Sequence, residues 1–212
     1  MKTDQLIAAL AADAKSTEMP IGRTLWLAFA SGLAVAAALY FMELGPRADL
    51  AAAFSSPRFL FKCLLTLSLL VSAMGLVWHL ARPGEAPMAW VLALAAVPAL
   101  LAGAVIVELI VVPVSGWEDL IFGMNWRICP LLIPMLSAGP LIALILALRQ
   151  GATNHPVLAG AAAGLLATGI GATLYATHCQ SDSPLFVAAW YVIATVIMTT
   201  LGAALGSRLL RY

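Results

Sequence analysis

Six long apolar runs dominate this chain and limit what it can fold into. They extend approximately over residues 25–44, 60–80, 88–112, 128–148, 157–177 and 185–206. Each is close to the ~20 residues that an α-helix needs to cross a lipid bilayer. Because lipid offers the backbone no hydrogen bonds, such runs must be helical. The sequence therefore predicts an all-α membrane protein, a bundle of six transmembrane helices.

The composition agrees with lipid as the main solvent. Of the 212 residues, 63% are hydrophobic and only 10% are charged, and the mean hydropathy is +0.99. A soluble domain covers much of its surface with polar groups, and this chain has too few of them. The net charge of +1 gives no reason to expect direct contact with nucleic acid.

Lysine and arginine residues are distributed unevenly between the two sides of the predicted bundle. Seven lie on the side of both termini (Lys2, Lys15, Arg23, Arg82, Arg149, Arg208 and Arg211), and four lie on the other (Arg47, Arg58, Lys62 and Arg127). Since basic loops favour the cytoplasmic side, we expect both termini inside the cell. The chain then divides into a cytoplasmic segment (1–24), a transmembrane domain (25–206) and a cytoplasmic tail (207–212).

The N-terminal segment has the pattern of a short amphipathic helix. Thr3 suits its N-cap, and Leu6, Ile7 and Leu10 then fall on one apolar face. A free helix this short is marginally stable in water, so its apolar face needs a partner. The bilayer surface and a cytoplasmic protein are both open as that partner.

Two cysteines are predicted to meet at the outer surface of the bundle. Cys129 begins the fourth run, and Cys179 lies in the polar loop after the fifth. The short connection between these two runs makes them antiparallel neighbours, so the two cysteines share one end. We expect a functional pair of thiols in a polar setting, whereas Cys63 is interpreted as a packing residue.

Other candidate metal ligands surround this pair in the sequence. His178 and Asp182 lie in the same loop as Cys179, and Glu118 and Asp119 precede Cys129. Thiolate, imidazole and carboxylate groups bind soft or borderline divalent cations. Cys129, Cys179, His178 and Asp182 therefore form a possible site for a transient divalent metal, a weaker signal than the thiol pair.

Glu108 is an acidic residue inside the third apolar run, near its outer end. An ionisable group at that depth is costly and marks a candidate functional site. The alternatives are that its side chain reaches the outer interface or pairs with Arg127.

Small residues in the last two runs indicate close helix packing. Two GxxxG patterns begin at Gly160 and Gly202, and such patterns let helix backbones approach each other in lipid. Packing within one chain is the favoured interpretation, and a homo-oligomer is the alternative. Pro98, Pro134 and Pro140 lie inside apolar runs, where we expect kinks.

The sequence contains no catalytic set, phosphate-binding loop or CxxC motif, so we do not expect an enzyme. Two other classes remain as alternatives. A small transporter or channel would need polar groups lining a midplane cavity, and a membrane thiol oxidoreductase would need a cysteine pair that turns over.

From end to end the chain resembles the NrsF family of bacterial inner-membrane anti-sigma factors. The resemblance rests on MKTDQLIAALAAD (1–13), LARPG (80–84), CPLLIP (129–134), ALRQG (147–151) and HCQSDSPLF (178–186). It implies six membrane helices and a cytoplasmic hold on an extracytoplasmic-function (ECF) sigma factor. It also implies release under metal or oxidative stress through two outward-facing cysteines, which match Cys129 and Cys179, while Cys63 is outside the pattern.

These observations combine into one hypothesis. The chain is a multi-pass inner-membrane protein whose Leu6, Ile7 and Leu10 contribute to binding an ECF-type sigma factor, and whose Cys129 and Cys179 sense stress on the other side.

Overall fold

The structure, a computed structural model, is entirely helical over the residues that it describes, which are residue 3 and residues 19–82, 87–151 and 153–210. The elements in chain order are α2 (Ile21–Glu43), α3 (Leu50–Ala53), α4 (Pro57–Leu80), α5 (Met88–Val111), η1 (Val114–Gly116), α6 (Trp117–Phe122), α7 (Cys129–Leu148), α8 (Pro156–Ala176), α9 (Pro184–Phe186), η2 (Val187–Tyr191) and α10 (Val192–Leu209). The predicted N-terminal helix with Leu6, Ile7 and Leu10 lies outside the described residues.

Six of the described helices are long and apolar enough to cross a membrane, as predicted: α2, α4, α5, α7, α8 and the continuous segment Pro184–Leu209, which joins α9, η2 and α10. The chain is therefore a multi-pass membrane protein. Three of these helices begin with proline, at Pro57, Pro156 and Pro184. Proline suits the first helical position because the N–H that it lacks has no partner there.

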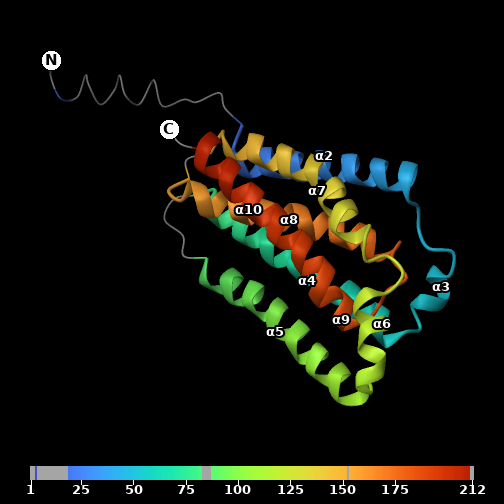
Figure 1. Cartoon of the computed structure of the whole chain (residues 1–212). Coiled ribbons are helices and arrows are strands. Elements are labelled where there is room, and N and C mark those ends of the chain that lie inside the picture. Colours follow the sequence, from blue (N-terminus) through green and yellow to red (C-terminus); the bar gives the residue numbers. More distant parts are fainter. Residues whose placement is uncertain (1–2, 4–18, 83–86, 152, 211–212) are drawn as a thin grey trace.

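The long helices run back and forth between two ends of the bundle (Figure 1). The start of α2 and the end of α10 lie at one end, which we call the terminal end. The short elements α3, α6 and α9 lie at the opposite end (Figure 1). Cys129 begins α7, and Cys179 lies between α8 and α9, so we call this the cysteine end.

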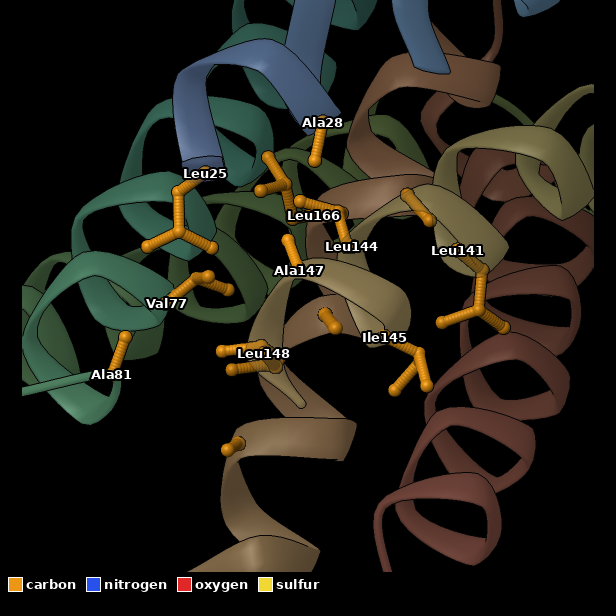
Figure 2. Packing of buried hydrophobic residues seen from close by; sticks show 14 of the residues in the cluster. Leu25, Ala28, Val77, Ala81, Leu141, Leu144, Ile145, Ala147, Leu148 and Leu166 are labelled. Atoms are coloured by element: carbon orange, nitrogen blue, oxygen red, sulfur yellow. The ribbon is translucent and has the colours of Figure 1, made fainter. Parts of the chain in front are cut away.

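Helix α8 occupies the centre and packs against α10, α4 and α7. Buried apolar residues form one cluster at the terminal end, where Leu25 of α2, Val77 of α4, Leu148 of α7 and Leu166 of α8 converge (Figure 2). A second cluster fills the cysteine end. Glycines along α8 let its neighbours approach closely.

The closest of these approaches joins α8 to α10. A Cβ atom added to Gly160 would lie 2.2 Å from the Gly202 carbonyl oxygen, and one added to Gly206 would lie 2.4 Å from the Pro156 carbonyl oxygen. Both GxxxG patterns are thus used inside one chain, which confirms the favoured interpretation. We call this contact the glycine seam.

Helix α5 lies at the edge of the bundle, and Glu108 is its one buried residue. Near its start, the Trp90 ring covers Gly75 of α4, where an added Cβ atom would lie 2.1 Å from the indole. Towards the cysteine end, a groove of about 590 Å³ separates α5 from α4. Pro98 lies inside α5, and Pro134 and Pro140 lie inside α7.

Candidate functional site: a buried thiol cluster

The cysteine loop, residues 177–183, joins α8 to α9 at the cysteine end. It begins with a turn in which the Cys179 N–H donates to the Tyr175 carbonyl at 2.9 Å. It ends where the Ser183 hydroxyl accepts a hydrogen bond from the Leu185 N–H at 3.1 Å and so caps the next helix. Both ends of the loop are thus fixed by the helices that it connects.

Cys129 and Cys179 belong to one buried cluster at the cysteine end, and their predicted pairing stays a prediction. Both residues have 0% of their surface exposed, and both pack in the cluster that contains Tyr175, Phe186 and Tyr191. The thiols are therefore not at an open polar surface, because they are packed in a cluster with aromatic residues of α8, α9 and η2. Neither cysteine forms a disulfide, and half-buried Cys63 is also a free thiol.

The thiols have few and weak polar partners. The Cys179 Sγ lies 3.8 Å from the Ser181 carbonyl oxygen and 3.9 Å from the Asn125 Nδ2. The Tyr175 hydroxyl, in the same cluster, makes no hydrogen bond of ordinary geometry. A buried hydroxyl without a partner is unusual in a native structure. The interior of this cluster therefore contains polar groups whose hydrogen bonding is incomplete.

Lys62 of α4 lies beneath the cysteine loop with 0% of its side chain exposed. Its Nζ donates to the Cys179 carbonyl at 2.8 Å, to the Ser181 carbonyl at 3.5 Å and to the Asp182 carboxylate. An ammonium group is costly to bury unless it is paired and hydrogen-bonded. Here the loop supplies all three acceptors, so burying the lysine and closing the loop depend on each other.

Arg47 holds the same loop from the α2–α3 connection. Its Nη1 donates to the Asp182 Oδ2 at 2.9 Å, and its backbone N–H donates to the Thr177 carbonyl at 3.0 Å. Its Nε also pairs with Asp49 at 2.7 Å. The hydrogen bond between the two side chains raises the pKa of Arg47 above its ordinary value and lowers the pKa of Asp49 below its ordinary value. Both groups are therefore charged at neutral pH.

The other candidate metal ligands are engaged elsewhere. The His178 ring nitrogen Nδ1 lies 2.9 Å from the Gly45 carbonyl oxygen, and Asp182 faces two cations. Within the described ranges, no three His, Cys, Asp or Glu side chains lie together as a metal site. The structure thus gives no support to the metal set Cys129, Cys179, His178 and Asp182, and Glu118 and Asp119 lie on the exposed surface of α6.

Glu108 connects α5 to the far end of the cysteine loop. One carboxylate oxygen accepts from the Ser183 hydroxyl at 2.7 Å and from the Leu185 N–H at 3.3 Å, while the other pairs with Arg58 at 2.8 Å. The alternative pairing with Arg127 is wrong, because the Arg127 guanidinium stacks on Trp126, 4.8 Å from the ring centre. The Glu108 carboxylate can thus be buried because Arg58 of α4 and the groups at the start of α9 supply it with partners.

Comparison with known proteins covers almost the whole chain. The family model for NrsF, negative regulator of sigma F, matches residues 10–212. The chain belongs to the NrsF family. It is 36% identical over 214 residues to the probable anti-sigma-F factor NrsF of Azospira oryzae, and 38% identical over 216 residues to the anti-sigma-F factor NrsF of Caulobacter vibrioides. Each alignment covers 100% of both proteins. No solved structure matches the chain.

Membership of the NrsF family confirms the resemblance in the sequence and identifies the chain as a regulator, not an enzyme. It also favours the regulatory interpretation over the transporter, channel and thiol-oxidoreductase alternatives.

Sequence reasoning missed several residues that build the site in this NrsF chain, namely Lys62, Arg47, Tyr175 and Tyr191. Lys62 could have been found, because a lysine inside a membrane-length run is costly and marks a functional or structural site. The two tyrosines carry no such signal, since aromatic residues are common near the ends of membrane helices.

Proposed function

We propose that this chain is an anti-sigma factor that sequesters an ECF-type sigma factor at the cytoplasmic membrane and releases it under stress. The observation that carries the proposal is the full-length match to two proteins that are both named as anti-sigma-F factors. A sigma factor held at the lipid surface cannot assemble with RNA polymerase on DNA.

In this proposal the terminal end faces the cytoplasm and the cysteine end faces the periplasm. The seven-to-four distribution of basic residues supports this orientation. An even number of spans agrees with both termini lying on one side. Reporter fusions or thiol labelling that placed Asp182 inside the cell and residue 211 outside would reverse the two faces and contradict the proposal.

The sigma factor is held through the N-terminal segment, whose apolar face is formed by Leu6, Ile7 and Leu10. This segment leads directly into α2, and α2 packs along α7. The contact between these helices is close, since a Cβ atom added to Gly32 would lie 2.8 Å from the Pro140 Cα. Cys129 is the first residue of α7. A displacement at Cys129 therefore has a tightly packed route along α7 and α2, from the cysteine end to the terminal end, where α2 begins.

Stress is sensed at Cys129 and Cys179. Oxidation of the two thiols by a two-electron oxidant would form one S–S bond, with two protons released and two electrons passed to the oxidant. The bond would fix the start of α7 to the end of α8. A soft metal ion shared by two thiolates would impose a similar constraint. A coupling of about 1–3 kcal/mol is enough for a 5- to 150-fold change in affinity for the sigma factor.

Purification of the tagged chain from native membranes tests the central claim. We expect a sigma factor to co-purify, and we expect deletion of the chain to raise transcription from promoters of that sigma factor. A preparation without a sigma factor, together with unchanged transcription after deletion, would contradict the proposal. It would also reopen the transporter and channel alternatives.

A further inference from the structure

The two thiols are buried in the structure, although a sensor on the surface of a membrane protein must meet its stimulus. Cys179 has 0% of its surface exposed, even though it lies in a loop at the end of the bundle. Side chains from α8, α9 and η2 pack around it. A water-soluble reagent can reach this thiol only when the cysteine loop moves away from the bundle, so access depends on what holds the loop in place.

Asp182 is the residue on which the main attachments of the loop converge. One of its carboxylate oxygens is bound by the buried Lys62 ammonium, and the other is bound by the Arg47 guanidinium. The same two cations also reach the Cys179 carbonyl, at 2.8 Å from Lys62 and 3.4 Å from Arg47. The carboxylate and the backbone beside the thiol are therefore held by one pair of side chains.

The charges around Asp182 make this attachment depend on a single carboxylate. Arg47 has a second partner in Asp49, which lies on the exposed side of the guanidinium. Lys62 has one carboxylate partner, Asp182, and its other acceptors are backbone carbonyls. Nearby, His178 is bound to the Gly45 carbonyl, and Glu108 is paired with Arg58. Loss of the Asp182 charge would leave a buried ammonium without a counter-ion, and such a group favours movement towards water.

We propose that Asp182, held by Lys62 and Arg47, is a latch that closes the cysteine loop over the Cys179 thiol. Opening of this latch is the step that admits a water-soluble oxidant or electrophile. The latch determines how often the thiol is reached, and the chemistry of the thiol then determines the signal. The access step stands on geometry alone, and its part in signalling rests on the proposed function.

The rate of alkylation of Cys179 measures opening of the latch directly. The full chain with Cys63→Ser and Cys129→Ser carries Cys179 as its one thiol. Reconstituted in membranes, it is treated with N-ethylmaleimide, and the rate is divided by the rate in denaturing detergent. A charge-assisted hydrogen bond changes an opening equilibrium by about 10- to 100-fold. We expect Asp182→Asn to raise the normalised rate by about that factor.

Asp49→Asn is the matched control, because Asp49 binds the same arginine without touching the loop. We expect its rate to stay within about twofold of the parent rate. An equal rate for Asp182→Asn, Asp49→Asn and the parent chain would overturn the latch. If Asp182→Asn does not fold, Lys62→Met with Asp182→Asn removes both charges and leaves no buried ion without a partner. This double variant must also show the faster alkylation, and a rate equal to that of the parent would overturn the proposal.

Transcription of a sigma-dependent reporter separates this inference from the proposed function. Faster alkylation of Asp182→Asn with an unchanged reporter response would keep the latch and contradict the sensing role of Cys179. Unchanged alkylation with a normal reporter response would contradict the latch and keep the anti-sigma function.

Discussion

The glycine seam and the cysteine end hold helices together in opposite ways. At the seam, α8 and α10 touch through backbone atoms, and each glycine leaves no space for a side chain. At the cysteine end, four separate elements are joined by ionised side chains and one short loop: the α2–α3 connection, α4, α5 and the start of α9.

This difference indicates where the molecule can change state. The contacts of the seam are made by backbone atoms, and no side chain that gains or loses charge takes part in them. The cysteine end depends on a carboxylate shared by two cations and on two thiols inside an aromatic cluster. A packed core is bistable at such points and not continuously deformable. We therefore expect a change of conformation at the cysteine end, while the packing of α8 against α10 at the seam stays the same.

The largest loss of stability is expected from a bulky residue at the seam. Gly160→Leu places carbon atoms where the backbone of α10 already lies, and a backbone cannot rotate away as a side chain can. We expect loss of folded protein, or destabilisation of at least about 3 kcal/mol. Thermal unfolding in detergent measures this effect. Gly103→Leu is the control, because nothing lies within 4 Å of a Cβ atom at Gly103. Equal stability of the two variants would show that the seam is not tight.

The next effect is expected at the buried cation. Lys62→Met keeps the volume of the side chain but removes all three hydrogen bonds to the cysteine loop. Because Asp182 retains Arg47, we expect destabilisation of about 2–3 kcal/mol, less than for an unpaired buried ion. Chemical denaturation in detergent checks the value. Arg127→Met, a change at an exposed cation that stacks on Trp126, should cost less than about 1 kcal/mol. If Lys62→Met lowered the stability no more than Arg127→Met, the hydrogen bonds of Lys62 to the cysteine loop would contribute nothing to stability.

A smaller and more local effect is expected at Glu108. Glu108→Gln keeps a hydrogen-bond acceptor for Ser183 but removes the ion pair with half-exposed Arg58. We expect a cost of about 1 kcal/mol and faster hydrogen exchange confined to the end of α5. Exchange measured by mass spectrometry locates the change. Faster exchange spread evenly over α8 and α10 would contradict the view that α5 is fastened separately.

The thiols themselves are expected to contribute little to stability and much to the response. Cys129→Ser or Cys179→Ser should leave the sigma factor bound but weaken its release under oxidant or metal stress. The proposed function treats the two thiols as one unit, so either single change should cost about as much signalling as both together. A sigma-dependent reporter measures the response. A double serine variant that responds normally would remove the thiols from the mechanism.

The smallest effect on the bundle is expected from changes in the N-terminal segment. Leu6→Asp together with Leu10→Asp should release the sigma factor, because burial of one leucine contributes about 1.5–3 kcal/mol to a docking contact. The unfolding temperature of the transmembrane domain should not change. If the double variant still binds the sigma factor, the segment is a lipid anchor, and the cytoplasmic loops near Arg82 and Arg149 become the candidate docking surface.

The length of the apolar runs was sufficient to predict the six spans, and the structure moves the starts of the proline-initiated helices by only one to three residues. Small-residue spacing was sufficient to predict the seam at Gly160 and Gly202. These features can be read from the chain because lipid constrains each segment by itself, before any segment meets another. The placement of Cys129 and Cys179 in one buried cluster also agrees with the topology, since adjacent antiparallel helices share their ends.

The tertiary structure alone decided which partner each polar group takes. Asp182 binds Lys62 and Arg47 instead of joining the cysteines, and Glu108 binds Arg58 and Ser183 instead of Arg127. The same is true of the burial of both thiols under aromatic rings. Sequence patterns report spacing along one helix, whereas these contacts join residues up to 135 positions apart. Their geometry depends on how helices pack sideways in the bundle, and no single segment of the sequence specifies that packing.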